Sequence, residues 1–412
     1  MMTVQEMARR AREAQPLLGN ATAQQRNQAL EEIARALEEA APAILEANAQ
    51  DVAAASHLPG PMVARLRLDG KKLQGLIDGV RAVAALPEVL GTEIASWRRP
   101  NGLLIRKVRV PLGVIGLIFE SRPGVTVDAA VLCLKAGNAV LLKGGQEAAR
   151  SIAALGQAIS TGLKRAGFPE DLVQVLPATR EAAAALMTAT GLVDVLIPRG
   201  GAGLIRAVLE QSRVPVIETG TGVCHVYVHK DADLAMARSI VVNAKCSNPA
   251  VCNAMETLLV DREVAGEFLP AVAADLREAG VELRACPEAR RWISWAGEAT
   301  EQDWATEYND LILSIRVVDG LDQALEHIRR YGTRHSEAIV TRNEAVAARF
   351  LSEVDAAAVY HNASTRFTDG GEFGFGAEIG ISTQKLHARG PMGLAELTSY
   401  KYLIYGDGQV RA

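Results

Sequence analysis

The amino-acid sequence predicts an α/β protein built from two parallel-sheet domains. The chain has 412 residues, which at roughly 150 residues per domain leaves room for two or three domains. From residue 108 onward, short segments that are apolar throughout alternate with longer segments of helical pattern, and a second series of this kind begins at His225. Short apolar strands between helices are typical of a parallel sheet covered on both faces.

Helices are predicted for residues 2 to about 84. Thr22 and Gln25 have the spacing of a capping box, and apolar residues recur after them with the helical period. A later helix over about 69–85 is expected to end before Pro87, because proline cannot continue a helix.

Two series of strands and helices follow. The first series has strands at 110–119, 139–142, 172–176, 193–197 and 214–217, and helices at 125–136, 147–166, 181–190 and 202–211. The second has strands at 225–229, 256–260, 281–285, 311–318, 338–341 and 358–361, and helices at 234–245, 266–279, 321–331 and 345–354. A break near residues 222–225 is the expected domain boundary.

Two segments predict exposed β structure. Pro100-Asn101-Gly102 is a hairpin signal between strands at Ile94–Arg98 and Leu103–Val110. The final segment, Leu397–Tyr405, has alternating tyrosines, and an unpaired strand of that kind invites pairing with another subunit. We therefore expect a homodimer or a larger even homo-oligomer. Between these segments, Arg366–Gly380 holds five glycines and predicts a long loop.

Composition argues against several classes of function. Lys plus Arg number 44 against 48 Asp plus Glu, so the net charge of −4 does not favour nucleic acid. The five cysteines are scattered and lack a C-x-x-C pair, which argues against a disulfide framework or a metal site and favours a reducing cytosol. No segment approaches the ~18 apolar residues of a spanning helix. We expect a cytoplasmic protein without metal, nucleic acid or membrane contact.

Cys252 lies in a polar loop just ahead of the apolar strand at 256–260. A lone cysteine is more often buried and inert, but loops at strand ends of α/β sheets gather catalytic groups, so both roles stay open. Glu218 follows an apolar segment and could be a general base, if burial raises its pKa, or a backbone cap. No G-x-G-x-x-G follows the first strand. Gly200 and Gly201 begin a helix and could bind a pyrophosphate or form a plain turn.

Several segments together resemble the aldehyde dehydrogenase superfamily: Val110–Phe119, Leu141–Lys143, Ile217–Gly220, Cys252, Tyr331–Gly332 and the glycine-rich tail. Longer segments closely resemble one family within it, the glutamate-5-semialdehyde dehydrogenases or γ-glutamyl phosphate reductases: Lys245–Thr257, Tyr331–Glu337, Asn362–Gly371 and Gly380–Gly393. The resemblance spans nearly the whole chain. It implies an aldehyde-dehydrogenase-like fold with two Rossmann-like domains and a small β oligomerisation element.

The resemblance also implies roles for particular residues. Cys252 falls on the nucleophile, Glu218 on the general base, Lys143 on the lysine at the adenine ribose and Glu307 on the glutamate at the nicotinamide ribose. The family reduces L-glutamyl 5-phosphate to L-glutamate 5-semialdehyde with NADPH in proline biosynthesis, releasing phosphate through a cysteine thioester. The remaining catalytic and cofactor candidates are Asn253, Gly144, Gly145, Gln146, Gly200, Gly201 and Gly220.

The sequence departs from the superfamily at two positions. Hydrolytic members have an oxyanion-hole asparagine where this chain has Ser121. The side chain that would donate a hydrogen bond to the oxyanion is therefore not assigned. NAD-dependent members often have a glutamate three residues after the lysine, whereas Gln146 is neutral. A neutral residue tolerates the 2′-phosphate that a carboxylate would repel, which fits NADP(H). Because phosphate rather than water releases the acyl group in reverse, Glu218 could instead position the cofactor or transfer a proton.

The implied substrate carries a carboxylate, an ammonium and a phosphate. Arg122 and Arg366 are candidate anion clamps, because a guanidinium fork matches carboxylate and phosphate oxygens. Glu120 or Asn362 could accept the ammonium. The alternative for each arginine is a solvated surface pair.

The resemblance suggests a division of the chain into four parts. Residues 1–225 are expected to bind NADP and to project the hairpin at about 94–110, and residues 226–362 to form the catalytic domain. Residues 363–384 are expected to return to the cofactor domain, and 385–412 to form an oligomerisation tail. Functional coupling to glutamate 5-kinase is a further expectation.

Three other functions stay open at this stage. A CoA-dependent acylating dehydrogenase of the same fold would ignore phosphate. A cofactor-binding scaffold without catalysis would not respond to loss of Cys252. A cysteine protease is the third, although no histidine has a sequence context that pairs it with Cys252.

Overall fold

The computed structural model describes residues 2–58 and 60–411 and divides the chain into two compact units. Unit 1 is Met1–Thr219, Gly374–Gly380 and Met392–Ala412, and unit 2 is Gly220–Phe373 and Ile381–Pro391. The boundary thus falls between Thr219 and Gly220 rather than after residue 225.

The predicted return of the chain over residues 363–384 is divided between the units, since only Gly374–Gly380 of it belongs to unit 1. Residues 365–368 stay in unit 2 because they hydrogen-bond to Asn253. Residues 381–391 stay there because strand β14 (Ile381–Ser382) pairs with β15 (Gly390–Pro391).

Unit 1 begins with five helices: α1 (Val4–Gly19), α2 (Ala23–Glu39), α3 (Ala41–Ala54), α4 (Gly60–Leu66) and α5 (Gly70–Ala85). The capping box of α2 is confirmed, since the Thr22 hydroxyl accepts from the Gln25 N–H and the Gln25 side chain accepts from the Thr22 N–H. Two amides that lack a partner inside the helix are thereby satisfied.

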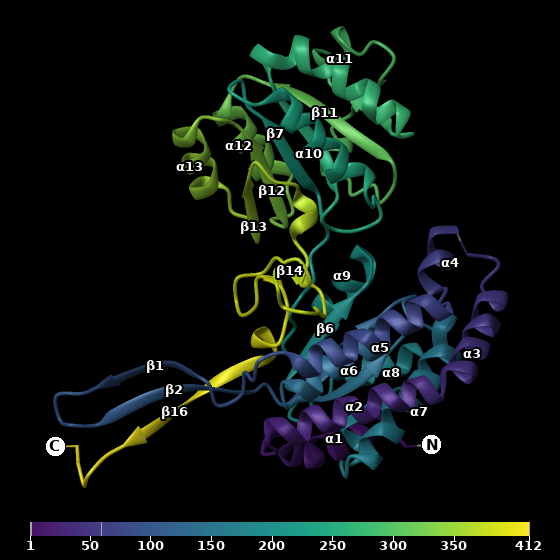
Figure 1. Ribbon diagram of the computed structural model, residues 1–412, viewed down its shortest axis with the longest axis vertical. Coiled ribbons are helices and arrows are strands. Elements are labelled where there is room, and N and C mark those ends of the chain that lie inside the picture. The colour runs from purple at the N-terminus through teal and green to yellow at the C-terminus, as the bar shows by residue number, and fades with distance from the viewer. Residues whose placement is uncertain (1, 59, 412) are drawn as a thin grey trace. The chain divides into compact units, whose positions relative to one another are not determined.

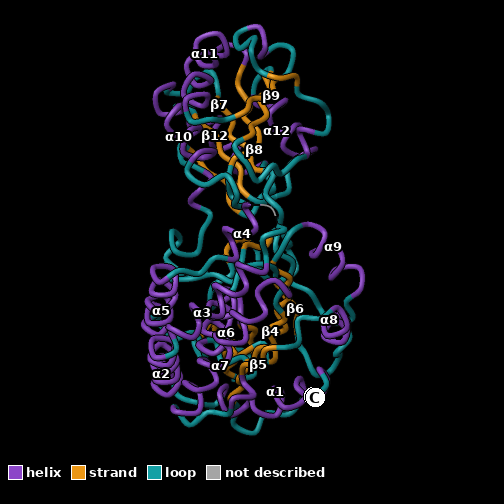
Figure 2. Tube along the Cα trace, turned by 90° about the vertical axis from the view of Figure 1, so that its right-hand side faces the viewer, coloured by secondary structure: helices purple, strands orange, loops and turns teal. Residues whose placement is uncertain are grey.

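The sheet of unit 1 is parallel with strand order β5-β4-β3-β6. Its strands are β3 (Val114–Phe119), β4 (Ala139–Lys143), β5 (Val173–Val175) and β6 (Val195–Arg199). Helices α6 (Val125–Lys135) and α7 (Ala149–Arg165) pack on one face under α2, α3 and α5, while α1, α8 (Arg180–Met187) and α9 (Ala202–Gln211) lie on the other (Figure 2). Short 3-10 turns occur at Gln146–Ala148, Glu170–Leu172 and Ala395–Leu397.

The strand order reverses at β3. From β3 the chain adds β4 and then β5 on one side, and it later adds β6 on the other side of β3. In open α/β sheets, ligands bind at the carboxyl ends of the strands at such a switch point. The residues that follow β3, β4 and β6 are therefore the first place to look for a ligand site in unit 1.

Two predicted strands of this region are wrong. The segment 110–119 is not one strand, because β2 (Leu104–Pro111) ends before Gly113, which has a positive φ of 126°. The segment 214–217 makes only a single bridge, between Val216 and Leu196. Pro215 lacks an N–H, so the segment cannot continue a regular ladder beside β6.

A three-stranded antiparallel sheet forms an arm of unit 1, with order β1-β2-β16 (Figure 1). It combines the predicted hairpin, β1 (Glu93–Arg98) and β2, with the predicted tail strand, β16 (Thr398–Tyr405). Several of its apolar residues are exposed: Ile94, Trp97, Tyr400, Tyr402 and Ile404. An edge strand with exposed apolar side chains favours pairing with another copy of the chain.

Unit 2 is built on a parallel sheet with order β10-β9-β11-β8-β7-β12-β13. Its strands are β7 (Cys224–Val228), β8 (Met255–Asp261), β9 (Glu282–Ala285), β10 (Gly297–Glu298), β11 (Ile312–Val318), β12 (Ser336–Val340) and β13 (Ala358–His361). Its helices are α10 (Leu234–Cys246), α11 (Arg262–Glu278), α12 (Leu321–Tyr331) and α13 (Glu344–Glu353), with 3-10 turns at Ala289–Arg291, Asp303–Ala305 and Thr365–Phe367.

Alternate residues of the unit 2 strands enter two separate cores. Val226, Val228 and Leu258 pack under α10 and α11, whereas Tyr227 and Leu259 pack under α12 and α13. Figure 2 shows α10 and α11 on one face of the sheet and α12 on the other. Because both faces are covered, the strands are apolar at every position, which is the pattern the sequence showed.

His327 of α12 is buried in a neutral form and predicts an acid-dependent loss of stability. The pKa of His327 is lowered from 6.5 to about 2. Burial is the largest cause, and the positive charges of His225 and then Arg316 add to it. Arg316 Nη1 donates to its Nδ1 at 2.9 Å, which fixes the neutral ring.

As the pH falls below 6.5, the unfolded chain binds a proton at His327 that the folded protein excludes. The free energy of unfolding should therefore fall by up to about 1.4 kcal/mol per pH unit from this group. Urea unfolding of wild type and His327→Gln between pH 7 and about pH 4 measures this, and the variant should show the shallower slope. Equal slopes would contradict the assignment.

Among the described residues, no helix is long and apolar enough to cross a membrane.

Candidate active site

The loop that carries Cys252 joins α10 to β8 in unit 2. A fully buried ion pair closes the base of this loop, since Lys245 Nζ lies 2.6 Å from Glu256 Oε2. Burial raises the pKa of Glu256 to about 7, and the Lys245 ammonium acts in the opposite direction. The pair therefore fixes the two ends of the loop against each other. Cys252 itself is half-buried and forms no disulfide.

The backbone of Cys252 rests on Gly222. A Cβ added to Gly222 would lie 1.4 Å from the Cys252 carbonyl oxygen and 2.8 Å from its Cα, so only glycine fits here. The thiol of Cys224 donates to the same carbonyl at 3.2 Å. Glu307 Oε1 accepts from the Gly222 N–H at 2.8 Å. Glu307, the predicted ribose ligand, thus holds the segment that supports the predicted nucleophile, Cys252.

Asn253 and Arg366 fasten the other side of the loop. The Asn253 amide donates to the carbonyl of Thr368 at 2.9 Å, and the Thr365 hydroxyl donates to the Asn253 carbonyl at 2.8 Å. The Arg366 guanidinium donates to the Asn253 side chain and, at 3.1 Å, to the Ser247 hydroxyl. Its fork therefore spans both ends of the Cys252 loop, so the predicted substrate clamp also has a clear positioning role.

Asn362 and Gly220, also in unit 2, have other partners. The Asn362 amide accepts from the Thr341 N–H and donates to the Thr341 carbonyl, both at 3.0 Å, and so extends the pairing of β12 with β13. Gly220 donates to the Ile381 carbonyl at 2.9 Å, and a Cβ there would meet Thr383 at 2.3 Å.

In unit 1, Ser121 follows β3 with a positive φ of 40° and is bound to Glu147. The backbone N–H and the hydroxyl of Ser121 donate to Glu147 Oε1 at 2.8 and 2.6 Å. Burial works to raise the pKa of Glu147, but the hydrogen bonds from Ser121 lower it below the ordinary value. The Ser121 hydroxyl therefore donates its hydrogen bond to the Glu147 carboxylate and not to an oxyanion of the substrate.

A cavity of about 810 Å³ opens at the carboxyl ends of β3 and β4. Lys143, half-buried at the end of β4, Gly145, Gln146 and Glu147 line it together with Arg150 and Arg180. Burial lowers the pKa of Lys143, against the carboxylates of Glu147 and Glu120. The absence of a side chain at Gly144 and Gly145 lets neighbouring side chains approach the backbone. A Cβ on Gly144 would lie 2.2 Å from the Ile152 side chain, and a Cβ on Gly145 would lie 2.3 Å from the Glu147 carboxylate.

The charges around this cavity fit a phosphate-bearing cofactor. Its carboxylates are already hydrogen-bonded, Asp51 by Ser151 and Glu147 by Ser121. In the described part of the chain, the Lys143 ammonium and the Arg180 guanidinium make no hydrogen bond or ion pair. A neighbouring apolar cavity of about 470 Å³, which includes Val175, Leu176 and Pro177, shares Ala178 with the first and suits a flat aromatic base.

Gly200 and Gly201 form the start of α9, as predicted for a pyrophosphate site. Glu120 Oε2 accepts from the Gly201 N–H at 2.9 Å, and a Cβ on Gly200 would lie 2.4 Å from that oxygen. An anionic group thus already lies at the helix N-terminus, where the helix dipole favours it. The predicted partner of the substrate ammonium, Glu120, is here a helix cap.

Glu218 and Arg122 complete the predicted set in unit 1. Glu218 is half-buried and makes no hydrogen bond or ion pair within the described residues. Arg122 lines a second cavity of unit 1 together with Arg199 and Asp128. Among the described residues, no cluster of histidine, cysteine and acidic side chains could hold a metal ion.

Sequence reasoning missed the residues that hold the candidate ones in place. Lys245 and Glu256 lie inside the segment that carries the family resemblance, so a buried charge pair across the loop could have been suspected. Glu147 is one residue beyond Gln146 and marks the first turn of a helix, where acidic residues are common. Nothing local in the sequence shows that Gly222 supports Cys252.

Comparison with known proteins agrees with the predicted fold. Residues 1–287 match the aldehyde dehydrogenase family. An acetylating aldehyde dehydrogenase from Geobacillus thermoglucosidasius shares the fold, with a TM-score of 0.71 at 19% identity over 99% of this chain and 97% of that one. The chain therefore belongs to the aldehyde dehydrogenase family, and both the predicted fold and the predicted class of oxidoreductase are confirmed.

Closer relatives narrow the assignment. A gamma-glutamyl phosphate reductase of Symbiobacterium thermophilum is 69% identical over 425 residues, covering 100% of both chains. The crystal structure of gamma-glutamyl phosphate reductase from Thermotoga maritima superposes with a TM-score of 0.97 at 47% identity, again over 100% of both chains. Within its family the chain is thus a member of the gamma-glutamyl phosphate reductases, as the sequence predicted.

Proposed function

We propose that the protein reduces L-glutamyl 5-phosphate to L-glutamate 5-semialdehyde with NADPH and releases phosphate, as a step of proline biosynthesis. The observation that carries the proposal is the Cys252 loop, fixed by Gly222, Asn253 and the Lys245–Glu256 pair. Full-length relatives named gamma-glutamyl phosphate reductase support the choice of substrate.

The Cys252 thiolate attacks the γ-carbonyl carbon of the acyl phosphate. A carbon–sulfur bond forms, the carbon–oxygen bond to phosphate breaks, and phosphate leaves with that electron pair. NADPH, when bound, supplies the hydride that reduces the resulting thioester carbon. Cys252 is then released as a thiolate when the carbon–sulfur bond breaks and the aldehyde forms. No water is activated at any step, so Glu218 acts in proton transfer or cofactor placement rather than hydrolysis.

The carbonyl oxygen gains negative charge during the attack and needs hydrogen-bond donors. The side chains of Ser121 and Asn253 already donate to Glu147 and to the Thr368 carbonyl. The backbone N–H groups of the Cys252 loop are therefore the proposed donors, and Ser121 acts by holding Glu147. This assigns Asn253 a positioning role for the loop.

The cofactor is proposed to lie in the 810 Å³ cavity of unit 1. Lys143 and Arg180 would face its ribose and phosphate oxygens, with Gly145 and Gln146 beside them and Gly200 and Gly201 near the pyrophosphate. Glu120 would have to release the Gly201 N–H for a phosphate to take its place. Glu307, a residue of unit 2, is proposed from the family resemblance to bind the nicotinamide ribose.

Gln146→Glu is expected to weaken NADPH use selectively. Gln146 is exposed at the cavity, and a carboxylate there would repel the 2′-phosphate. The KM for NADPH should rise by at least about tenfold while the KM for NADH changes little. Gln157→Glu, on the exposed face of α7, is the matched control and should leave both unchanged. Equal effects on both cofactors would contradict the assignment.

Assembly and location stay predictions. The arm of β1, β2 and β16 supports a homodimer or a larger even homo-oligomer, since it exposes apolar side chains on edge strands. A cytoplasmic location and functional coupling to glutamate 5-kinase follow from the proposed pathway.

The proposed reaction is tested by its dependence on phosphate. With L-glutamate 5-semialdehyde and NADP⁺, the purified protein should form NADPH only when phosphate is present, and coenzyme A should not replace phosphate. A rate that is independent of phosphate, or that requires coenzyme A, would contradict the proposal.

A further inference from the structure

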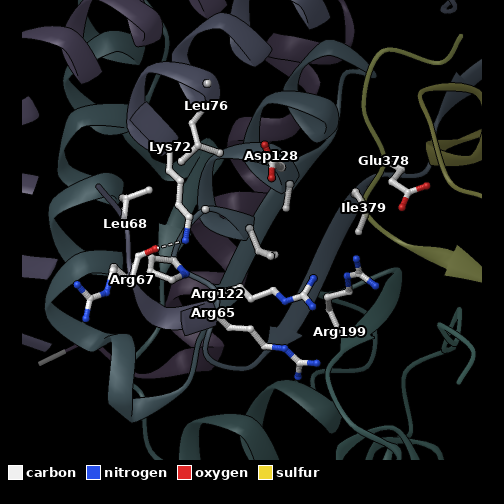
Figure 3. A pocket seen from close by; sticks show the side chains of 15 residues that line it. Arg65, Arg67, Leu68, Lys72, Leu76, Arg122, Asp128, Arg199, Glu378 and Ile379 are labelled. Carbon is white, nitrogen blue, oxygen red and sulfur yellow. Dashed lines mark hydrogen bonds between the residues drawn. The ribbon is translucent and has the colours of Figure 1, made fainter. Parts of the chain in front are cut away.

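A second cavity of unit 1, of about 350 Å³, carries an unusual set of charges. Five cationic side chains line it, together with two acidic ones: Arg65, Arg67, Lys72, Arg122 and Arg199, with Asp128 and Glu378. Figure 3 shows these side chains around the cavity. Such an excess of cations indicates a site for an anion, and the acidic groups indicate that the ligand also has a positive charge.

The cations divide into two groups by their orientation. Lys72 Nζ donates to the Arg67 carbonyl at 2.8 Å and to the Ala64 carbonyl at 3.3 Å, so it holds the end of α4. The Arg67 guanidinium points away from the others (Figure 3). The guanidinium groups of Arg65, Arg122 and Arg199 gather on the other side of the cavity (Figure 3).

The place of these arginines in the fold agrees with a ligand site. Arg122 follows β3 and Arg199 ends β6, which puts both at the carboxyl ends of the two strands of the switch point. Arg65 reaches the same cavity from α4. Three separate segments of unit 1 therefore contribute a guanidinium to one cavity.

Asp128 supplies the opposite charge. It lies in the first turn of α6, and its carboxyl group makes no hydrogen bond or ion pair with any described residue. Burial raises the pKa of Asp128 to about 6, and the positive charge of Arg199 acts in the opposite direction. Asp128 is half-buried, and a partly desolvated carboxyl group without a partner among the described residues is stabilised by a ligand cation, because an unpaired charge removed from water is costly.

We propose that this cavity binds the amino-acid end of the substrate, with the α-carboxylate on Arg65, Arg122 and Arg199 and the α-ammonium at Asp128. The inference rests on the proposed function and assigns its substrate contacts to unit 1. The acyl phosphate end is placed outside the cavity, because the carbon that carries the phosphate must react with Cys252 and because the ammonium of the amino-acid end is the group that Asp128 attracts. Asn362 and Arg366 are already engaged in unit 2.

The test compares KM values in the direction of aldehyde oxidation. Arg65→Gln, Arg199→Gln and Asp128→Asn are assayed with L-glutamate 5-semialdehyde, NADP⁺ and phosphate. Arg67→Gln is the matched control, because Arg67 lines the cavity but points away. The arginine variants should raise the KM for the semialdehyde roughly tenfold or more, with the KM for phosphate and the Kd for NADPH within about twofold of wild type.

Two substrate analogues assign the individual charges. 5-Oxopentanoate lacks the ammonium and 4-aminobutanal lacks the carboxylate. Asp128→Asn should lose most of the preference of wild type for the semialdehyde over 5-oxopentanoate. The arginine variants should lose the preference over 4-aminobutanal.

Two further measurements keep the result interpretable. Thermal unfolding shows whether each variant is folded. Arg65→Lys is a milder variant, because it keeps the positive charge and removes only the guanidinium fork. Calorimetric binding of L-glutamate requires no turnover, and the arginine variants should lose it. A rise in the KM for phosphate, or variants that match Arg67→Gln, would overturn the inference. A wild-type protein without phosphate-dependent activity would instead contradict the proposed function.

Discussion

Replacement of Cys252 by alanine is expected to lower kcat by about 10⁴-fold or more, because Cys252 is the group proposed to form the thioester. NADPH binding and the melting temperature should stay close to wild type. Cys252 is half-buried, and the loop is held by its backbone contacts with Gly222 and by Asn253, none of which needs the sulfur. Steady-state assays with fluorescence titration of NADPH measure the two effects separately.

Cys246→Ala is the matched control for this experiment. Cys246 is likewise half-buried and in no disulfide, and it lies at the end of α10 just before the same loop. The control should retain activity within a few-fold of wild type. Turnover by Cys252→Ala at a rate near that of the control would show that the chemistry does not pass through this sulfur.

Gly222→Ala is expected to have the second largest effect. The added Cβ would lie 1.4 Å from the Cys252 carbonyl oxygen and 2.4 Å from its carbonyl carbon. These are backbone atoms, so the overlap is relieved only if the Cys252 loop moves away from the segment at Gly222. A displaced nucleophile costs activity steeply, and we expect a fall in kcat/KM of about 10²-fold or more together with a lower melting temperature.

Gly79→Ala is the control for the glycine change. Gly79 lies in α5, where an added Cβ meets nothing within 4 Å. Alanine should there raise the stability of the helix by roughly 0.5–1 kcal/mol without affecting activity. If Gly222→Ala were as active as Gly79→Ala, the close approach of Gly222 to Cys252 would have no importance for catalysis.

The sequence predicted most strands and helices because their patterns are local. The bounds of α9 (Ala202–Gln211), α12 (Leu321–Tyr331) and β13 (Ala358–His361) agree with the prediction to the residue. Strands that are covered on both faces are apolar throughout, and their ends are marked by glycine, proline or polar residues. The segment at 214–217 misled the prediction because its apolar pattern hides the effect of Pro215 on the ladder.

The candidate site was predictable only where a residue's role is visible in a motif. Cys252 came from resemblance to a family, since a lone cysteine in a loop is otherwise ambiguous. The bonds that fix it join residues far apart in the chain, such as Arg366 with Ser247 and Asn253. Ser121 and Glu147 are joined in the same way across β4. Periodicity and spacing carry no signal for such pairs.

The most direct test of the account is a reaction without phosphate. When the protein is mixed with L-glutamate 5-semialdehyde and NADP⁺ alone, the thioester should form but not be released. NADPH should then appear in a burst equal to the number of active sites, and mass spectrometry should place the acyl group on Cys252. Phosphate should discharge it and restore turnover. Continuous NADPH formation without phosphate, or an adduct on another residue, would contradict the account.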